Sequence, residues 1–108
     1  MQLTSFQTFN PPAAAQGAIP QPIARGTSVP VRALVRNAGA TLIFLGGTAE
    51  DVVGADGVPS SATYRLPAGA TDVFVLAPEQ TLFAIGAGAG ATIGVSVSEA
   101  IPLGQGGA

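Results

Sequence analysis

The chain has 108 residues, only 9% of them charged, and a formal net charge of −2. It contains no cysteine, histidine, lysine or tryptophan, which excludes disulfides, thiolate nucleophiles, sulfur metal sites and the commonest general base. Four arginines give no basic patch for nucleic acid, no stretch of 18 apolar residues predicts a membrane helix, and the length fits one domain.

The scarcity of charge also bears on association. Hydrophobic residues make up 47% of the chain, whereas the charged residues that keep soluble proteins apart are few. We therefore expect part of the surface to be covered by other copies of the chain or by a partner protein. The N-terminus lacks the positive start and apolar segment of a secretory signal, so we expect synthesis in the cytoplasm.

Residues 1–28 differ from the rest of the chain. The stretch NPPAAAQGAIPQPIARGTS holds four prolines and little alternation, and proline fixes φ and removes a backbone donor. This composition predicts an extended arm rather than part of the core. We expect partner contacts from its apolar anchors Phe6 and Phe9, and from Pro11 and Pro12.

Strand patterns begin with VPVRALVRN at 29–37. Small apolar residues at alternate positions face one side, whereas Arg32, Leu34 and Arg36 face the other. Such alternation predicts a half-buried strand with a charged outer face. Arg32 and Arg36 are therefore candidates for contact with a partner.

The next segment combines a turn, a buried strand and a longer excursion. NAG at 37–39 predicts a turn, and the apolar run ATLIFLG at 40–46 predicts a central strand buried on both faces. The excursion that follows holds an Asp-Gly turn pair at 56–57. Its one short helical candidate is TAEDVV at 48–53, with Thr48 as the cap.

The second half of the chain alternates short strands with turn sequences. PAGA and APEQ are typical turns between strands. The glycine-rich sequence AGAGA predicts the turn of a hairpin, in which the last two strands pair with each other. The predicted strands are ATYRL at 62–66, TDVFVL at 71–76, TLFAIG at 81–86 and TIGVSVSE at 92–99.

Seven or eight short strands at this spacing predict an all-β protein, an antiparallel β-sandwich resembling a jelly roll. We expect an extended Pro-rich N-terminal arm at 1–28, a sandwich domain at 29–102 and a glycine-rich tail at 103–108.

One motif suggests a cofactor. Gly86, Gly88 and Ala91 satisfy G-x-G-x-x-G/A, the fingerprint of a dinucleotide-binding loop. That loop must open a helix, whose free N–H groups hold the pyrophosphate. The residues after Ala91 instead alternate with period two, which predicts a strand, so we expect no cofactor.

Acidic and basic residues offer two further candidate sites. Glu50, Asp51 and Asp56 could bind Ca²⁺, but their spacing fits no EF-hand, and a solvated loop explains them better. Arg32, Arg36 and Arg65 could pair across strands with Asp72 and Glu99, or could meet acidic residues of a partner. We expect no bound metal.

Catalysis is not expected. Four serines have no histidine or lysine to activate them; they are Ser60, Ser61, Ser96 and Ser98. Asp51 and Asp72 could form the carboxylate pair of a glycosidase, but such enzymes hold sugar in an aromatic cleft, and this chain has one tyrosine and no tryptophan.

The stretch YRLPAGATDVFVLAPEQTLFAIGAGAGATIGVSVSEAIP resembles the closing strands of small β-sandwich structural proteins of tailed bacteriophage virions. The resemblance covers about residues 29–102 and is strongest from Tyr64 to Pro102. It implies a head decoration or cement protein that binds the major capsid protein across capsomer seams, non-enzymatic and often trimeric. The alternative is a receptor- or glycan-binding tip, head-fibre or tail module with a ligand patch on the loops at 46–60 or 86–91.

Overall fold

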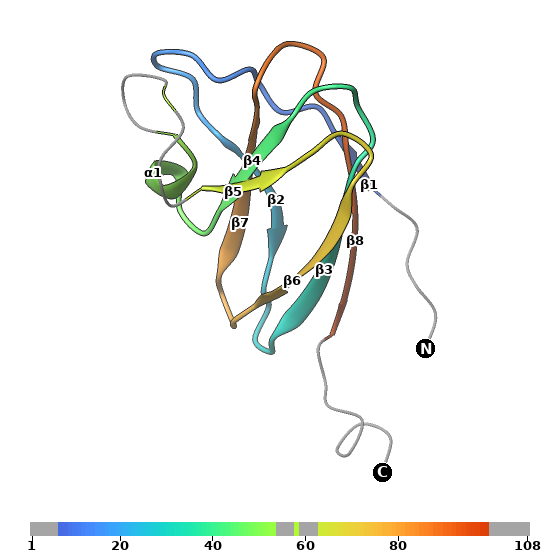
Figure 1. The fold of residues 1–108 in the computed structure, drawn as a ribbon. Helices are drawn as coiled ribbons and strands as arrows, with labels where there is room; N and C mark the ends of the chain where they lie inside the picture. The colour runs from blue at the N-terminus through green and yellow to red at the C-terminus, as the bar shows by residue number, and fades with distance from the viewer. Residues whose placement is uncertain (1–6, 54–57, 59–62, 100–108) are drawn as a thin grey trace.

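A computed structural model describes residues 7–53, 58 and 63–99 (Figure 1). Within these residues, eight strands form two four-stranded sheets that pack face to face, and one short helix lies outside the sheets. Sheet A contains, in spatial order, β1 (Gln7–Phe9), β8 (Ile93–Glu99), β3 (Val31–Asn37) and β6 (Thr71–Leu76). Sheet B contains β2 (Gln21–Arg25), β7 (Thr81–Gly86), β4 (Ile43–Gly46) and β5 (Tyr64–Leu66).

The order of the strands is that of an eight-stranded jelly roll. Strand β1 pairs with β8, β2 with β7, β3 with β6 and β4 with β5, and every one of these pairs is antiparallel. All connections between consecutive strands therefore cross from one sheet to the other, except that from β4 to β5. The predicted β-sandwich is confirmed.

Alternation of side chains builds the core between the sheets. Along β3 the burial alternates residue by residue, with Val31, Ala33 and Val35 buried and Arg32 and Arg36 exposed, as the sequence predicts. The central strand predicted at 40–46 appears as β4, between β5 and β7, with its first three residues buried. The main core also takes its largest fully buried side chains from both sheets; they are Ile43, Leu45, Leu66 and Ile93.

The position of the N-terminal segment shows that the predicted domain boundary at residue 29 is wrong. The segment is extended, but residues 7–28 belong to the sandwich, because β1 pairs with β8 and β2 pairs with β7. Ile23 is 4% exposed and lies in the main core. Proline at the edge of a sheet removes no ladder hydrogen bond, and Pro22 lies on edge strand β2 at a shift in register. Residues 1–6 and the predicted tail at 103–108 lie outside the described residues.

The predicted hairpin at AGAGA is also wrong. Gly86 ends β7 in sheet B and Ile93 begins β8 in sheet A, so the turn joins the two sheets instead of two paired strands. A Cβ at Gly86 would lie 2.7 Å from the Cβ of Ala91, which shows how tightly the chain crosses there. A turn sequence marks a reversal but not the sheet that the chain enters. The residues after the glycines form β8 and not the helix that a dinucleotide loop requires.

A second, smaller core lies on the outer face of sheet B. Helix α1 (Ala49–Val52) begins at Thr48, whose hydroxyl accepts a hydrogen bond from the Asp51 N–H, as predicted for a cap. The helix lies over this face, on the side away from sheet A (Figure 1). Val52 of the helix and Val53 at its end are buried there together with Phe44 of β4 and Ile85 of β7.

Candidate functional site

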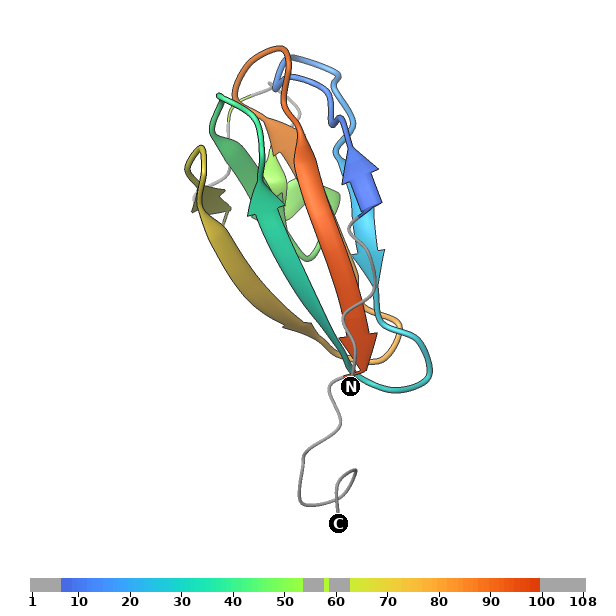
Figure 2. The ribbon, with the colours of Figure 1, turned by 90° about the vertical axis from the view of Figure 1, so that its right-hand side faces the viewer.

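The outer face of sheet A is the candidate contact surface. Arg32, Leu34 and Arg36 of β3 stand beside Val75, Val73 and Thr71 of β6 in the same register. Val73 is 44% exposed and Val75 62%. In the part of the chain that the structure describes, no helix or loop covers β3 and β6 on this side, and Figure 2 shows the sheet open to the viewer. Apolar side chains between two arginines are typical of protein contact surfaces.

Arg32 and Arg36 form no ion pair with any described side chain; the salt bridge that does occur, Arg25–Glu79, involves neither of them. The predicted cross-strand pairing with Asp72 is wrong. Asp72 stands opposite Val35, whose side chain is fully buried, so the carboxylate starts from the other side of the sheet. The side chain of Glu99 is outside the described residues. Arg65, on β5, lies over the ring of Phe44, 5.6 Å from its centroid.

Asp72 instead links the two sheets along the flank of the sandwich where β6 and β5 are the edge strands. Its carboxylate accepts hydrogen bonds from the Tyr64 hydroxyl and from the Val73 N–H. The Tyr64 hydrogen bond, followed by the Val73 bond, lowers the pKa of Asp72, and the same bond to Asp72 raises the pKa of Tyr64. The Tyr64 ring also meets Phe74 edge to face, with centroids 5.2 Å apart.

The four edges of the two sheets are not equally protected. Strands β1 and β5 are each three residues long, and β2 carries Pro22 and a register shift. Short strands, prolines and bulges are the usual means of blocking edge-to-edge pairing. Strand β6 has six residues, an unbroken register with β3, no proline and one charged residue, Asp72. Among the described edge strands, β6 is therefore the one best able to pair with a strand of another molecule.

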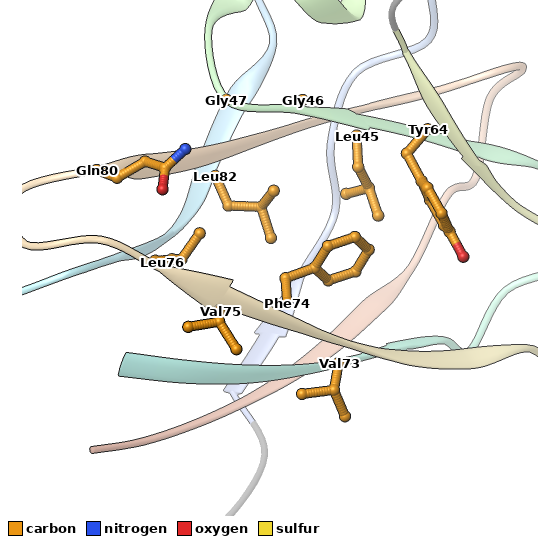
Figure 3. A pocket seen from close by; sticks show the side chains of 10 residues that line it. All are labelled: Leu45, Gly46, Gly47, Tyr64, Val73, Phe74, Val75, Leu76, Gln80 and Leu82. Atoms are coloured by element: carbon orange, nitrogen blue, oxygen red, sulfur yellow. The ribbon is translucent and has the colours of Figure 1, made fainter. Parts of the chain in front are cut away.

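A pocket of about 340 Å³ opens between the sheets alongside β6 (Figure 3). Because β5 is short, the space between β6 and β4 is left open beyond Tyr64. Leu45, Leu76 and Leu82 line its interior, whereas Val73 and Val75 point to the opposite side of β6. The remaining lining residues are Gly46, Gly47, Tyr64, Phe74 and Gln80.

The polar side chains of this pocket are few, and both Gln80 and Tyr64 already form a hydrogen bond within the chain. The Gln80 side-chain oxygen accepts from the Ala77 N–H at 3.0 Å, and the Tyr64 hydroxyl donates to Asp72. The lining holds no serine, threonine, cysteine or lysine side chain, and its one hydroxyl is that of Tyr64. Chemically, the pocket suits an apolar side chain more than a polar substrate.

The predicted contact residues of the N-terminal segment are used differently. Pro11 is buried, so its side chain is not offered to a neighbour. Phe9 is half-buried and packs against the main core, and its contact with a partner stays a prediction. Pro12 is exposed, and its carbonyl accepts the Gly86 N–H at 2.8 Å. Phe6 lies outside the described residues, and its role stays a prediction.

The other candidates remain apart. Glu50 and Asp51 lie in the first turn of α1, and Asp56 is not among the described residues. Within the described ranges no three metal-ligating side chains come together. Ser96 is 3% exposed and lies on β8, whereas Ser60 and Ser61 are outside the described residues.

Sequence reasoning missed Val73, Val75 and Tyr64. The run VFVL is apolar at every position, so alternation could not assign its two faces, and nothing local marks β6 as an edge strand. Within the described chain, no helix has the length and hydropathy needed to cross a membrane. Comparisons with protein-family models, with curated proteins and with solved structures find no match for the chain.

Proposed function

We propose that the chain is a non-enzymatic structural component of a tailed-bacteriophage virion, a decoration subunit that binds the major capsid protein and stabilises the head. The observation that carries this proposal is the exposed β6 side of the outer face of sheet A. There Val73 and Val75 are exposed beside Arg32 and Arg36, which form no ion pair among the described side chains. Exposed apolar residues flanked by arginine suit burial against another protein.

The architecture and the composition support the same role. The jelly roll recurs in viral capsid proteins, although it also recurs in lectins and cupins, so this support is an analogy at the level of the fold. A ligand that binds only the assembled state stabilises that state by mass action. Many copies on one lattice would therefore strengthen a shell without requiring a tight single contact.

Binding to heads tests the proposal. Phage heads assembled without the chain would be mixed with the purified chain, pelleted, and analysed for bound copies per copy of capsid protein. We expect saturable binding and a higher temperature of head disruption. The double variant Val73→Ser/Val75→Ser should lose most of the occupancy, because it removes the apolar centre of the face while keeping both arginines.

Ile19→Ser is the matched control, because Ile19 is also exposed (78%) but lies in the segment that leads to β2 of sheet B. This variant should occupy heads like the natural chain. Heads that fail to bind the natural chain, or that bind the double variant equally well, would contradict the proposal.

A second candidate, a glycan-binding tip, is supported by the position of the pocket alone, because the mostly apolar lining suits a sugar less well than an apolar side chain. Gly46 and Gly47 line it and belong to the loop region at 46–60 that the sequence suggested for a ligand patch. A glycan array separates the two functions: a decoration subunit gives no signal, whereas a tip protein binds a defined set of sugars through this pocket.

A further inference from the structure

The backbone at the end of β3 shows which groups of β6 face outward. The Asn37 N–H donates to the Ala70 carbonyl and the Gly69 N–H to the Asn37 carbonyl, both at 2.9 Å. Asn37 therefore directs its backbone groups toward the β6 side, and in an antiparallel pair alternate residues of a strand do the same.

The partners of those alternate residues are Asp72, Phe74 and Leu76, which bond back to β3. The N–H and C=O groups of Val73 and Val75 consequently point to the open edge. The Val73 N–H agrees with this direction, because it donates to the Asp72 carboxylate at 2.8 Å rather than to β3. The Val73 N–H is therefore already bonded, and the edge presents the Val73 carbonyl and the Val75 N–H and carbonyl to an added strand.

A strand added antiparallel to this edge would place its side chains in two defined environments. Residues opposite Phe74 and Leu76 would point inward, into the pocket of about 340 Å³ that is lined by Leu45 and Leu82. Backbone bonds with pockets for alternate side chains are the usual basis of strand addition. The inward positions therefore select apolar side chains.

The outward positions meet the arginines. Arg32 lies beside Val75 and Arg36 beside Thr71 in the register of β3 with β6. A residue opposite Val75 or Thr71 on an added strand would be two strand spacings from these arginines, about 9–10 Å between backbones. Extended arginine and glutamate side chains together span this distance over the small Val75 and Thr71, so these positions select carboxylates.

We propose that β6 accepts an extended segment of another protein as a fifth strand of sheet A, with apolar side chains opposite Phe74 and Leu76 and carboxylates opposite Thr71 and Val75. The inference rests on the proposed function only in taking the partner to be a capsid protein. The chemistry of the segment follows from the edge, the pocket and the two arginines.

A second copy of the chain fits this edge less well. Paired with itself, β6 would present Thr71, Val73 and Val75 on the outer face, none of which can form an ion pair with Arg32 or Arg36. The other described edge strands, β1, β2 and β5, contribute no carboxylate either. The charge of the outer face therefore calls for an acidic partner segment.

A synthetic peptide tests the proposal without any particle. The peptide GSVEVTSEGS places valines opposite Leu76 and Phe74 and glutamates opposite Val75 and Thr71 when it runs antiparallel to β6. A second peptide, GSVKVTSKGS, replaces both glutamates with lysine. Binding would be measured by fluorescence anisotropy, and the site located by amide NMR shifts. We expect the glutamate peptide to bind, with the largest shifts on β6.

Charge reversal supplies the decisive comparison. Arg32→Glu/Arg36→Glu should weaken the glutamate peptide about tenfold and strengthen the lysine peptide, since exposed pairs each contribute modestly. Arg65→Glu, the control, makes the same kind of charge change on sheet B and should alter neither affinity. Equal binding of the glutamate peptide to the double variant and the natural chain would overturn the proposal.

A backbone variant tests the strand itself. Val75→Pro removes an outward N–H and should lower the affinity for the glutamate peptide at least about tenfold, whereas Val75→Thr keeps that N–H and should bind within about threefold of the natural chain. Should the proline variant fail to fold, the charge reversal still decides. If no peptide binds while the chain occupies heads, strand addition is wrong and the proposed function stands. If the glutamate peptide binds and heads do not, strand addition stands and the proposed function is wrong.

Discussion

The outer faces of the two sheets present the same kind of side chain in opposite situations. On sheet B, Phe44 and Ile85 point away from the main core, yet α1 and the segment before β2 bury them to 5% and 0% exposure. On sheet A, Val73 and Val75 also point outward, and they remain 44% and 62% exposed. An outward apolar residue is thus explained by the chain itself on one sheet, whereas on the other it calls for a partner.

The largest expected difference in stability comes from truncating one outward apolar side chain on each sheet. Ile85→Ala should lower the free energy of unfolding by about 2–5 kcal/mol, because it leaves a cavity beneath α1. Val75→Ala should change it by no more than about 0.5 kcal/mol, because an exposed side chain loses little on truncation. Urea denaturation of both variants measures the difference. Similar losses would mean that the face of sheet A is already covered within the isolated chain.

The next largest effect on the free energy of unfolding concerns Asn37, whose buried side-chain amide links the two sheets. Asn37 ends β3 in sheet A, and its side-chain N–H groups donate to the carbonyls of Thr41 (2.8 Å) and of Leu66 on β5 (2.9 Å). Its side-chain oxygen accepts from the Gly39 N–H at 3.2 Å. Asn37→Ala removes the donor to the buried Leu66 carbonyl and to the part-buried Thr41 carbonyl, whereas the Gly39 N–H keeps the Thr92 carbonyl at 3.2 Å. The variant should cost about 1–3 kcal/mol in the same assay.

A control at the next residue separates the loss of this amide from any change in the turn that follows β3. Ala38 is exposed, so Ala38→Ser adds a hydroxyl that water can reach and should leave the free energy of unfolding within about 0.5 kcal/mol of the natural value. An Asn37→Ala variant as stable as the natural chain would show that the tie between β3 and β5 is not needed.

Much of the fold was accessible from the sequence because the strands obey local rules. The limits of β6 and β7 coincide with TDVFVL and TLFAIG, since turn residues bound both runs. The pairing was not accessible: AGAGA predicts a reversal equally well within a sheet and between sheets. The two N-terminal strands were missed because prolines conceal the alternation, and only their partners β8 and β7 reveal them.

The candidate site was accessible only in part. Arg32 and Arg36 were identified because β3 alternates cleanly between buried and exposed residues. Val73 and Val75 could not be placed, because their run is apolar on both faces and its exposure depends on which strand lies at the edge. The burial of the outer face of sheet B by α1 and by the segment before β2 likewise depends on contacts between distant segments. Local sequence patterns do not show which sheet is covered in this way.

The smallest effect concerns the tie across the open flank beside sheet A. Tyr64→Phe keeps the ring contact with Phe74 but removes the hydroxyl bound to Asp72. The variant should be slightly less stable near pH 7, by less than either loss above, because both groups are largely exposed. Urea midpoints of the variant and the natural chain, compared across pH, measure it.

The pH dependence has a definite sign. The lowered pKa of Asp72 means that its contribution is complete above the ordinary aspartate value of about 3.9 and disappears as pH falls through the folded value. The raised pKa of Tyr64 means that its contribution holds below about 10 and disappears as pH rises through the folded value. The natural chain and Tyr64→Phe should therefore differ between about pH 5 and 9 and converge at both extremes. A difference that persisted unchanged at low pH would show that the Tyr64 hydroxyl stabilises the chain without the charged Asp72 carboxylate. No difference at any pH would show that the flank beside β6 is held by packing of the ring rather than by this hydrogen bond.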